Sequence, residues 1–264
     1  MHGMKIYRFI ISFAVIMIMV SCADKGDKYA FQYVSFKESI PYERGKESPA
    51  CSFDFNVLKA HGADTIFADA FNVDISYTLF GKRTTDVRGA MISFVDSIIN
   101  DFKVQNNEQR DYAKQNGIEN PYYFDFEYSV DTEISYGNGV DIIGCNINWY
   151  QYTGGAHGGT FITCRNYRLE DGSVVTLDNY FKPGYEKVLI PVLEKHLLKE
   201  TGCPDREHLD DYGYFPEQPM FVPDNFQILK DSIAFIFNQY DIAPYSTGIT
   251  TLFVPNDEIR DIIK

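Results

Sequence analysis

One histidine of this chain stands among four glycines, in the segment Tyr150–Gln–Tyr–Thr–Gly–Gly–Ala–His–Gly–Gly–Thr160. Glycine permits positive φ and close backbone approach, so the segment predicts an exposed loop with His157 at its tip. Two interpretations fit this loop. In one, the glycines serve the turn, and the imidazole caps a carbonyl or packs on Trp149. In the other, the imidazole and the glycine amides face a ligand, because loops held by rigid strands commonly carry function.

A second group of candidate residues lies near the C-terminus, in Asn238–Gln–Tyr–Asp–Ile–Ala–Pro–Tyr245. Tyr240 and Tyr245, with Tyr152 before the loop, offer flat apolar faces and hydroxyls that suit sugars and protein contacts. Asp241 could serve a glycan hydrolase as acid or base, assisted by the loop histidine. Such an enzyme needs two carboxylates at a suitable separation, and no recognisable pair occurs. The alternative is a rigid turn whose tyrosine is packed.

Signatures of catalysis and metal binding are missing from the sequence. No Gly-x-Ser-x-Gly elbow occurs, and the glycine-rich loop lacks the Gly-Lys-Ser/Thr of a phosphate-binding loop. The remaining histidines do not stand at metal-ligand spacing from the loop histidine. We therefore predict no catalytic residue, no metal site and no cofactor. The histidines concerned are His2, His61, His196 and His208.

Strand patterns flank the loop on both sides. Cys145, Ile147 and Trp149 alternate with two asparagines, which is the period of a half-buried strand. Residues 160–169 are again rich in β-branched and aromatic side chains, so the two segments predict a hairpin. The same criteria predict strands at 67–80, 122–136 and 250–254 and a hairpin at 226–238.

Two amphipathic helices are predicted. The first begins with Thr84 or Thr85 as its N-cap and carries apolar residues at three- and four-residue spacing as far as Phe102. The second covers 185–197 and contains Pro191, which should kink or split it. Because the strands fall into two sets with one helix each, we predict an α+β fold of antiparallel sheets, each covered by an amphipathic helix.

The N-terminal segment has the pattern of an export signal. Lys5 and Arg8 precede an apolar run, 9–20, that is too short to span a bilayer, and small residues precede Cys22. This predicts a lipoprotein signal peptide at 1–21, lipidation of Cys22 and a polar tether at 22–30. Ordinary signal cleavage elsewhere is the alternative.

Four cysteines follow Cys22, and an even number in an oxidising compartment permits disulfides. Cys145 and Cys164 lie on the two strands of the same predicted hairpin, so we name them as a candidate disulfide. Buried free thiols are the alternative, because unpaired cysteines are among the most buried residues.

The chain is acidic, with a net charge of −13 and a pI of about 4.8. This charge disfavours non-specific binding to nucleic acid or to an anionic membrane face. We predict no nucleic-acid partner and membrane contact through the N-terminal lipid only.

A family resemblance rests on motifs in a fixed order. Tyr152–Thr–Gly–Gly–Ala–His–Gly158 is followed by a strand, by Leu177–Asp178 and Phe181, by an amphipathic helix and by Asn238–Tyr245. This order resembles the RsiV-like domain of unknown function, the extracytoplasmic C-terminal part of the anti-sigma factor RsiV. The segment Phe67–Trp149 resembles its companion, which is also found ahead of the catalytic domain in the peptidoglycan deacetylase PdaC. The resemblance implies an N-terminal α+β domain at 31–139 and a C-terminal one at 140–264.

The resemblance implies a binding or sensing role, since RsiV-type receptors bind lysozyme outside the membrane. This chain departs from them in carrying only a lipid signal as its membrane attachment. We expect a non-enzymatic lipoprotein of the bacterial envelope, periplasmic or surface-exposed, that binds cell-wall glycan or an extracytoplasmic protein such as lysozyme. The alternative is a cell-wall glycan hydrolase or an accessory domain of peptidoglycan modification. The candidate contact residues are Tyr152, His157, Tyr240, Asp241 and Tyr245.

Overall fold

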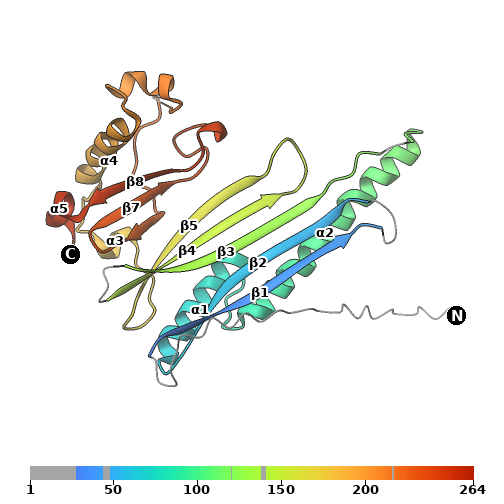
Figure 1. The fold of residues 1–264 in the computed structure, drawn as a ribbon, viewed down its shortest axis with the longest axis horizontal. Coiled ribbons are helices and arrows are strands. Elements are labelled where there is room, and N and C mark those ends of the chain that lie inside the picture. The colour runs from blue at the N-terminus through green and yellow to red at the C-terminus, as the bar shows by residue number, and fades with distance from the viewer. Residues whose placement is uncertain (1–27, 44–47, 120, 138–140, 216) are drawn as a thin grey trace.

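The computed structural model describes residues 28–43, 48–119, 121–137, 141–215 and 217–264. The predicted signal peptide at 1–21, Cys22 and most of the predicted tether lie outside the described residues. Helices and strands are labelled in Figure 1.

The larger of two sheets has five strands in the order β1-β2-β3-β4-β5. Every neighbouring pair is antiparallel except β2 and β3, which run parallel from Cys51↔Phe126 to Asn56↔Asp131. The predicted α+β class is therefore confirmed, but the sheet is mixed and not wholly antiparallel. The reason is the connection: two helices carry the chain from the end of β2 back to the end at which β2 began. The strands are Ala30–Pro41, Ala50–His61, Phe126–Tyr136, Ile142–Tyr152 and Gly159–Arg168.

The first of these helices, α1 (Thr65–Phe80), corrects the strand predicted at 67–80. Its large side chains recur every second residue, as in a strand, but four of them also recur every fourth residue, as on one face of a helix. These four side chains are buried in the structure. The Asp64 carboxylate caps the helix by accepting from the Phe67 amide, and Gly81 ends it at a φ of 67°. The side chains on the buried spacing are Phe67, Phe71, Ile75 and Leu79.

The second helix, α2 (Val87–Gln115), continues beyond Phe102 through a highly polar segment, which forms its solvated end. Its N-cap is Asp86, whose carboxylate accepts from the Gly89 amide; Thr84 instead accepts from the Asp86 amide. Figure 1 shows α1 and α2 along one face of the five-stranded sheet. Their apolar sides and the facing strands form the first core, which includes Phe55, Phe71, Met91, Phe102, Val130 and Ile147.

The second sheet has three antiparallel strands, β6 (Phe226–Ile228), β7 (Ser232–Phe237) and β8 (Thr250–Pro255). Helix α4 (Glu186–Thr201) covers it as one helix that includes Pro191, so the proline does not split it. Short helices and 3₁₀ segments complete this part of the chain: α3 Leu177–Tyr180, α5 Asn256–Ile259, Arg206–Tyr212, Tyr245–Thr247 and Arg260–Ile262.

The predicted boundary between 139 and 140 falls between β3 and β4, which pair with each other from Glu127↔Tyr152 to Tyr136↔Ile143. The larger sheet is therefore continuous across that position. Apart from Ile142 of β4, the residues of the second core come after Val174, which still packs on the first core, and begin with Val175.

An ion pair fixes α1 to the outer strand β5. Arg165 donates two hydrogen bonds to the Asp74 carboxylate, at 2.9 and 2.6 Å, and the Tyr167 hydroxyl donates a third at 2.8 Å. The Tyr167 ring is fully buried, and burial together with the nearby carboxylate raises the pKa of its hydroxyl. The hydroxyl is therefore a hydrogen-bond donor over the physiological range.

Cys145 and Cys164 do not form the predicted disulfide, since both are free and buried. In the β4–β5 ladder Cys145 is opposite Arg165, and Cys164 is opposite Asn146. Neighbouring positions along a strand point to opposite faces, so Cys145 faces the first core while Cys164 packs beside Ala234 on the other side of the sheet. The two thiols are separated by the sheet itself.

We expect the described cysteines to resist alkylation in the folded protein and to react once it unfolds. Burial raises the pKa of Cys51 and of Cys164 to about 12, so the reactive thiolate is scarce at about pH 8. Iodoacetamide labelling followed by peptide mass spectrometry, with and without urea, measures this. Labelling of Cys164 without urea, or a peptide mass that shows a Cys145–Cys164 bridge, would contradict the structure.

Candidate functional site

The predicted hairpin is confirmed as β4 and β5, whose last pair before the loop is Gln151↔Gly159. Close ring contacts explain two of the loop glycines. A side chain at Gly154 would lie 2.4 Å from the Phe124 ring, and one at Gly158 would lie 2.5 Å from the Tyr150 hydroxyl. Gly154 also has a φ of 94°. The loop is thus shaped by aromatic rings that lie against its backbone.

His157 is exposed at this loop, as predicted. Its Nδ1 lies 3.1 Å from the Gly158 carbonyl, so the tautomer with a proton on Nδ1 donates there. Tyr152 donates from its hydroxyl to the Gly155 carbonyl at 3.1 Å. Burial and the neighbouring Tyr122 raise the pKa of the Tyr152 hydroxyl.

The C-terminal turn is held by Asp241. The Asn238 amide donates to the Asp241 carboxylate at 2.7 Å, and the Asp241 amide donates back to the Asn238 carbonyl at 3.0 Å. This carboxylate therefore serves the turn itself. Tyr240, which directly precedes Asp241, has a φ of 72° and an exposed side chain. A tyrosine held in the left-handed region costs about 1–3 kcal/mol, which the surrounding contacts must offset.

The two predicted segments meet at the surface. The rings of His157 and Tyr245 stack with centroids 3.8 Å apart and planes 22° apart, and Tyr240 follows at 6.2 Å from Tyr245. Tyr150 lies against the loop backbone at Gly158, next to His157. Burial, and then Glu127 and Tyr245, raise the pKa of its hydroxyl. We call Tyr150, His157, Tyr240 and Tyr245 the aromatic cluster.

Sequence reasoning missed Tyr150 as a neighbour of this group. Tyr150 and Tyr152 are two residues apart on one strand and therefore share a face of the sheet. This two-residue spacing could have indicated Tyr150 as a further contact residue beside Tyr152. The nearby Glu127 could not be found in this way, because it comes from β3 and reaches the cluster only through strand pairing.

Side-chain amides hold the C-terminal turn against β5. The edge of β5 away from β4 presents the backbone groups of Thr160, Ile162 and Cys164, and amides bind them where a further strand would. Asn238 accepts from the Ile162 amide at 2.8 Å and donates to its carbonyl at 3.0 Å. Asn225 bonds the Cys164 amide and the same carbonyl, both at 2.8 Å.

Two further side chains extend this arrangement at its ends. Gln239 accepts from the Thr160 amide at 3.3 Å. Asn166, on β5 itself, donates to the Phe226 carbonyl at 2.7 Å and accepts from the Ile228 amide at 3.0 Å. We call Asn166, Asn225, Asn238 and Gln239 the amide junction. It joins the two sheets and fixes the position of Tyr245 relative to the loop.

Within the described ranges, no group of three or more histidine, cysteine, aspartate and glutamate side chains is placed to hold a metal ion. Nor does any described helix combine the length and the apolar character needed to cross a membrane. What the aromatic cluster offers chemically is contact: ring faces, hydroxyls and one imidazole, with an acidic side chain beside them.

Two family models match this chain. Residues 45–160 match the model described as "Deacetylase PdaC", and residues 178–257 match the one described as "Protein of unknown function (DUF3298)". The first match includes the whole glycine-rich segment 150–160, and the second includes the C-terminal turn. The aromatic cluster is therefore assembled from both matched segments.

Solved structures share the fold. A DUF3298 family member from Bacteroides fragilis NCTC 9343 superposes with a TM-score of 0.81 at 22% identity, over 92% of this chain and 96% of that one. A DUF3298 family protein from Pseudomonas aeruginosa PAO1 gives a TM-score of 0.56 at 18% identity, over 91% and 97% of the two chains.

A curated relative matches over a shorter range. Esterase Rv3036c of Mycobacterium tuberculosis (strain ATCC 25618 / H37Rv) is 30% identical over 115 residues, which are 43% of this chain and 48% of the relative. The match thus spans about half the length of that protein. The solved structures show the shared fold. The two family models, one of a deacetylase domain and one of a domain of unknown function, indicate a protein of the cell envelope.

The amide junction yields a stability prediction. Asn238→Ala leaves the Ile162 amide without its acceptor, and an unsatisfied buried donor costs about 1–3 kcal/mol. We expect the urea midpoint to fall accordingly. Asn148→Ala is the matched control, because Asn148 is exposed on β4, and it should change the free energy of unfolding by less than about 0.5 kcal/mol. Equal midpoints for the two variants would show that the junction does not hold the sheets together.

Proposed function

We propose that this protein is a non-enzymatic lipoprotein of the bacterial envelope that binds cell-wall glycan or an extracytoplasmic protein through the aromatic cluster. One observation carries the proposal: His157 and Tyr245, from segments far apart in the sequence, stack at 3.8 Å on the surface. Neither segment buries its ring in a core. The fold instead uses the amide junction to hold both rings at an accessible position.

The composition of the cluster fits recognition. Tyrosine has a flat apolar face and a hydroxyl, and it loses little conformational freedom on binding, so tyrosines are common where proteins contact sugars and other proteins. The strained backbone of Tyr240 supports the same role, since strain of this kind gathers at functional sites. The cluster is also preformed, which reduces the entropic cost of binding.

Charge bears on the choice of protein partner. The chain carries −13 overall, and Glu127 lies beside Tyr150. A basic protein such as lysozyme would be attracted to this surface, in agreement with the resemblance to RsiV-type receptors. Attachment of the exported chain to the membrane would come from the lipid on Cys22, in the periplasm or at the cell surface.

The proposal is tested by the affinity of the full chain for peptidoglycan fragments and for lysozyme. Contacts at the centre of an interface are worth about 1–2 kcal/mol or more, so we expect His157→Ala and Tyr245→Ala each to weaken binding by about tenfold. Tyr136→Ala is the matched control, since Tyr136 is exposed at the opposite end of β3. Isothermal titration calorimetry gives the affinities, and circular dichroism verifies folding. Undiminished affinity of both folded variants would remove the cluster from the binding site.

Hydrolysis is the second candidate function, favoured by the match to the mycobacterial esterase over 115 residues. The candidate groups are His157 and Asp241, which would act on wall glycan or on an ester. If the binding proposal is right, the protein releases no soluble fragments from labelled peptidoglycan. It also cleaves p-nitrophenyl acetate no faster than a control sample of the Tyr136→Ala variant that has been unfolded by heat. Turnover that His157→Ala or Asp241→Asn abolishes would replace the binding proposal with an enzymatic one.

A further inference from the structure

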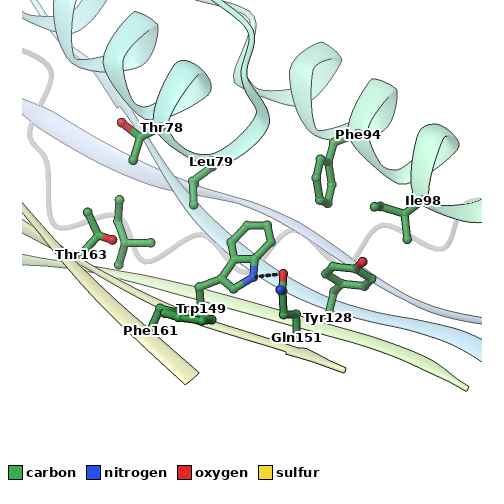
Figure 2. A pocket seen from close by; sticks show the side chains of 10 residues that line it. Thr78, Leu79, Phe94, Ile98, Tyr128, Trp149, Gln151, Phe161 and Thr163 are labelled. Carbon is green, nitrogen blue, oxygen red and sulfur yellow. Dashed lines mark hydrogen bonds between the residues drawn. The ribbon is translucent and has the colours of Figure 1, made fainter. Parts of the chain in front are cut away.

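A recess lies on the helix-covered side of the larger sheet (Figure 2). It has a volume of about 350 Å³ and lies between helices α1 and α2 on one side and strands β3, β4 and β5 on the other. Trp149 and Gln151 point into it, whereas the intervening Tyr150 belongs to the aromatic cluster, so the two sites use opposite faces of β4. The lining residues are Thr78, Leu79, Phe94, Ile98, Tyr128, Ile147, Trp149, Gln151, Phe161 and Thr163.

Aromatic rings make up much of the wall. The Trp149 indole lies edge-on to Phe94 at 5.6 Å and to Tyr128 at 6.2 Å, and these contacts hold it in one orientation. Phe161 stands at the mouth with 39% of its surface exposed. Below them Ile147 is fully buried and closes the floor. A ligand would therefore meet rigid ring surfaces.

Polar groups are placed among these rings. The Trp149 Nε1–H donates to the Gln151 Oε1 at 3.2 Å, which orients the amide and leaves its NH₂ available (Figure 2). Within the part of the chain that the structure describes, the hydroxyls of Thr78, Tyr128 and Thr163 bond no other protein group. Burial raises the pKa of Tyr128 to about 12, so its hydroxyl stays protonated and can donate.

The lining selects for the charge and shape of the ligand. Among the residues that the structure describes, no charged side chain lines the recess, so an ionic ligand would find no counter-charge there. A plain hydrocarbon chain would cover four polar groups without bonding them, at about 1–3 kcal/mol for each. A neutral ring with an apolar face and hydroxyls around its edge meets both conditions, because it stacks on the indole and bonds the four groups.

We propose that this recess binds one uncharged sugar ring. The ring lies against Trp149, and its hydroxyls bond the Gln151 amide and the hydroxyls of Thr163, Thr78 and Tyr128. The site is separate from the aromatic cluster and does not depend on it, because none of the cluster residues lines the recess.

The chain supplies its own probe, since Trp149 is its only tryptophan. Titration of the full chain with N-acetylglucosamine and its β-1,4-linked oligomers should give a saturable change in indole fluorescence. Thr163→Val and Gln151→Leu each remove one hydrogen-bonding group and should weaken binding by about three- to tenfold. Thr251→Val, on β8, is the matched control and should leave the dissociation constant unchanged.

The same titration separates this proposal from the previous one. With His157→Ala, the fluorescence response to sugar should keep its dissociation constant, even where that variant has lost affinity for peptidoglycan or lysozyme. No saturable response to any of these sugars would overturn the recess proposal. So would a response to decanol in place of sugar, or equal affinities in folded Thr163→Val, Gln151→Leu and wild type.

Discussion

The architecture depends on the hydrogen bonds that side-chain amides make along the outer edge of β5. An edge strand presents alternating donors and acceptors that would otherwise pair with water or with another chain. An amide side chain carries both a donor and an acceptor, so Asn225 and Asn238 can each satisfy backbone groups of this edge. The sheet ends there without a sixth strand, and the second sheet is attached at the same place.

The aromatic cluster follows from this attachment. Asn238 bonds β5 through its side chain and anchors the turn of Asp241 through its backbone. This backbone turn then sets the position of the Tyr245 ring against the His157 ring. A single asparagine thus links the stability of the junction to the geometry of the ring pair at the surface.

Much of this could be predicted from the sequence, where local patterns were strong. The β4–β5 hairpin, its exposed histidine and the C-terminal strands follow from alternation and from glycine placement. Helix α1 could not be distinguished from a strand, because Phe71 and Ile75 satisfy periods of two and of four at once, and burial in the assembled core decides between them. The parallel pairing of β2 and β3 was equally hidden, since it depends on α1 being a helix.

Other features arise only from tertiary contacts. Cys145 and Cys164 looked like partners because they lie on one hairpin, but the pairing register places them on opposite faces. The asparagines of the amide junction resemble ordinary loop residues in the sequence, because their partners are backbone groups some 60–80 positions away. Asp241 was predicted as a ligand contact because the sequence does not show that its carboxylate accepts from the Asn238 amide in the folded turn.

The parallel pair at the centre of the larger sheet also has a kinetic consequence. β1 with β2, and β3 with β4 and β5, are hairpins that need only short loops to close. Joining them along Cys51↔Phe126 requires the whole intervening helical segment to be traversed first, and such long-range closure is entropically slow. The β1–β2 unit and the β3–β4–β5 unit should therefore form first. Until they pair, the backbone groups along the facing edges of β2 and β3 lack their strand partners. The chain is most exposed to misassociation during that interval.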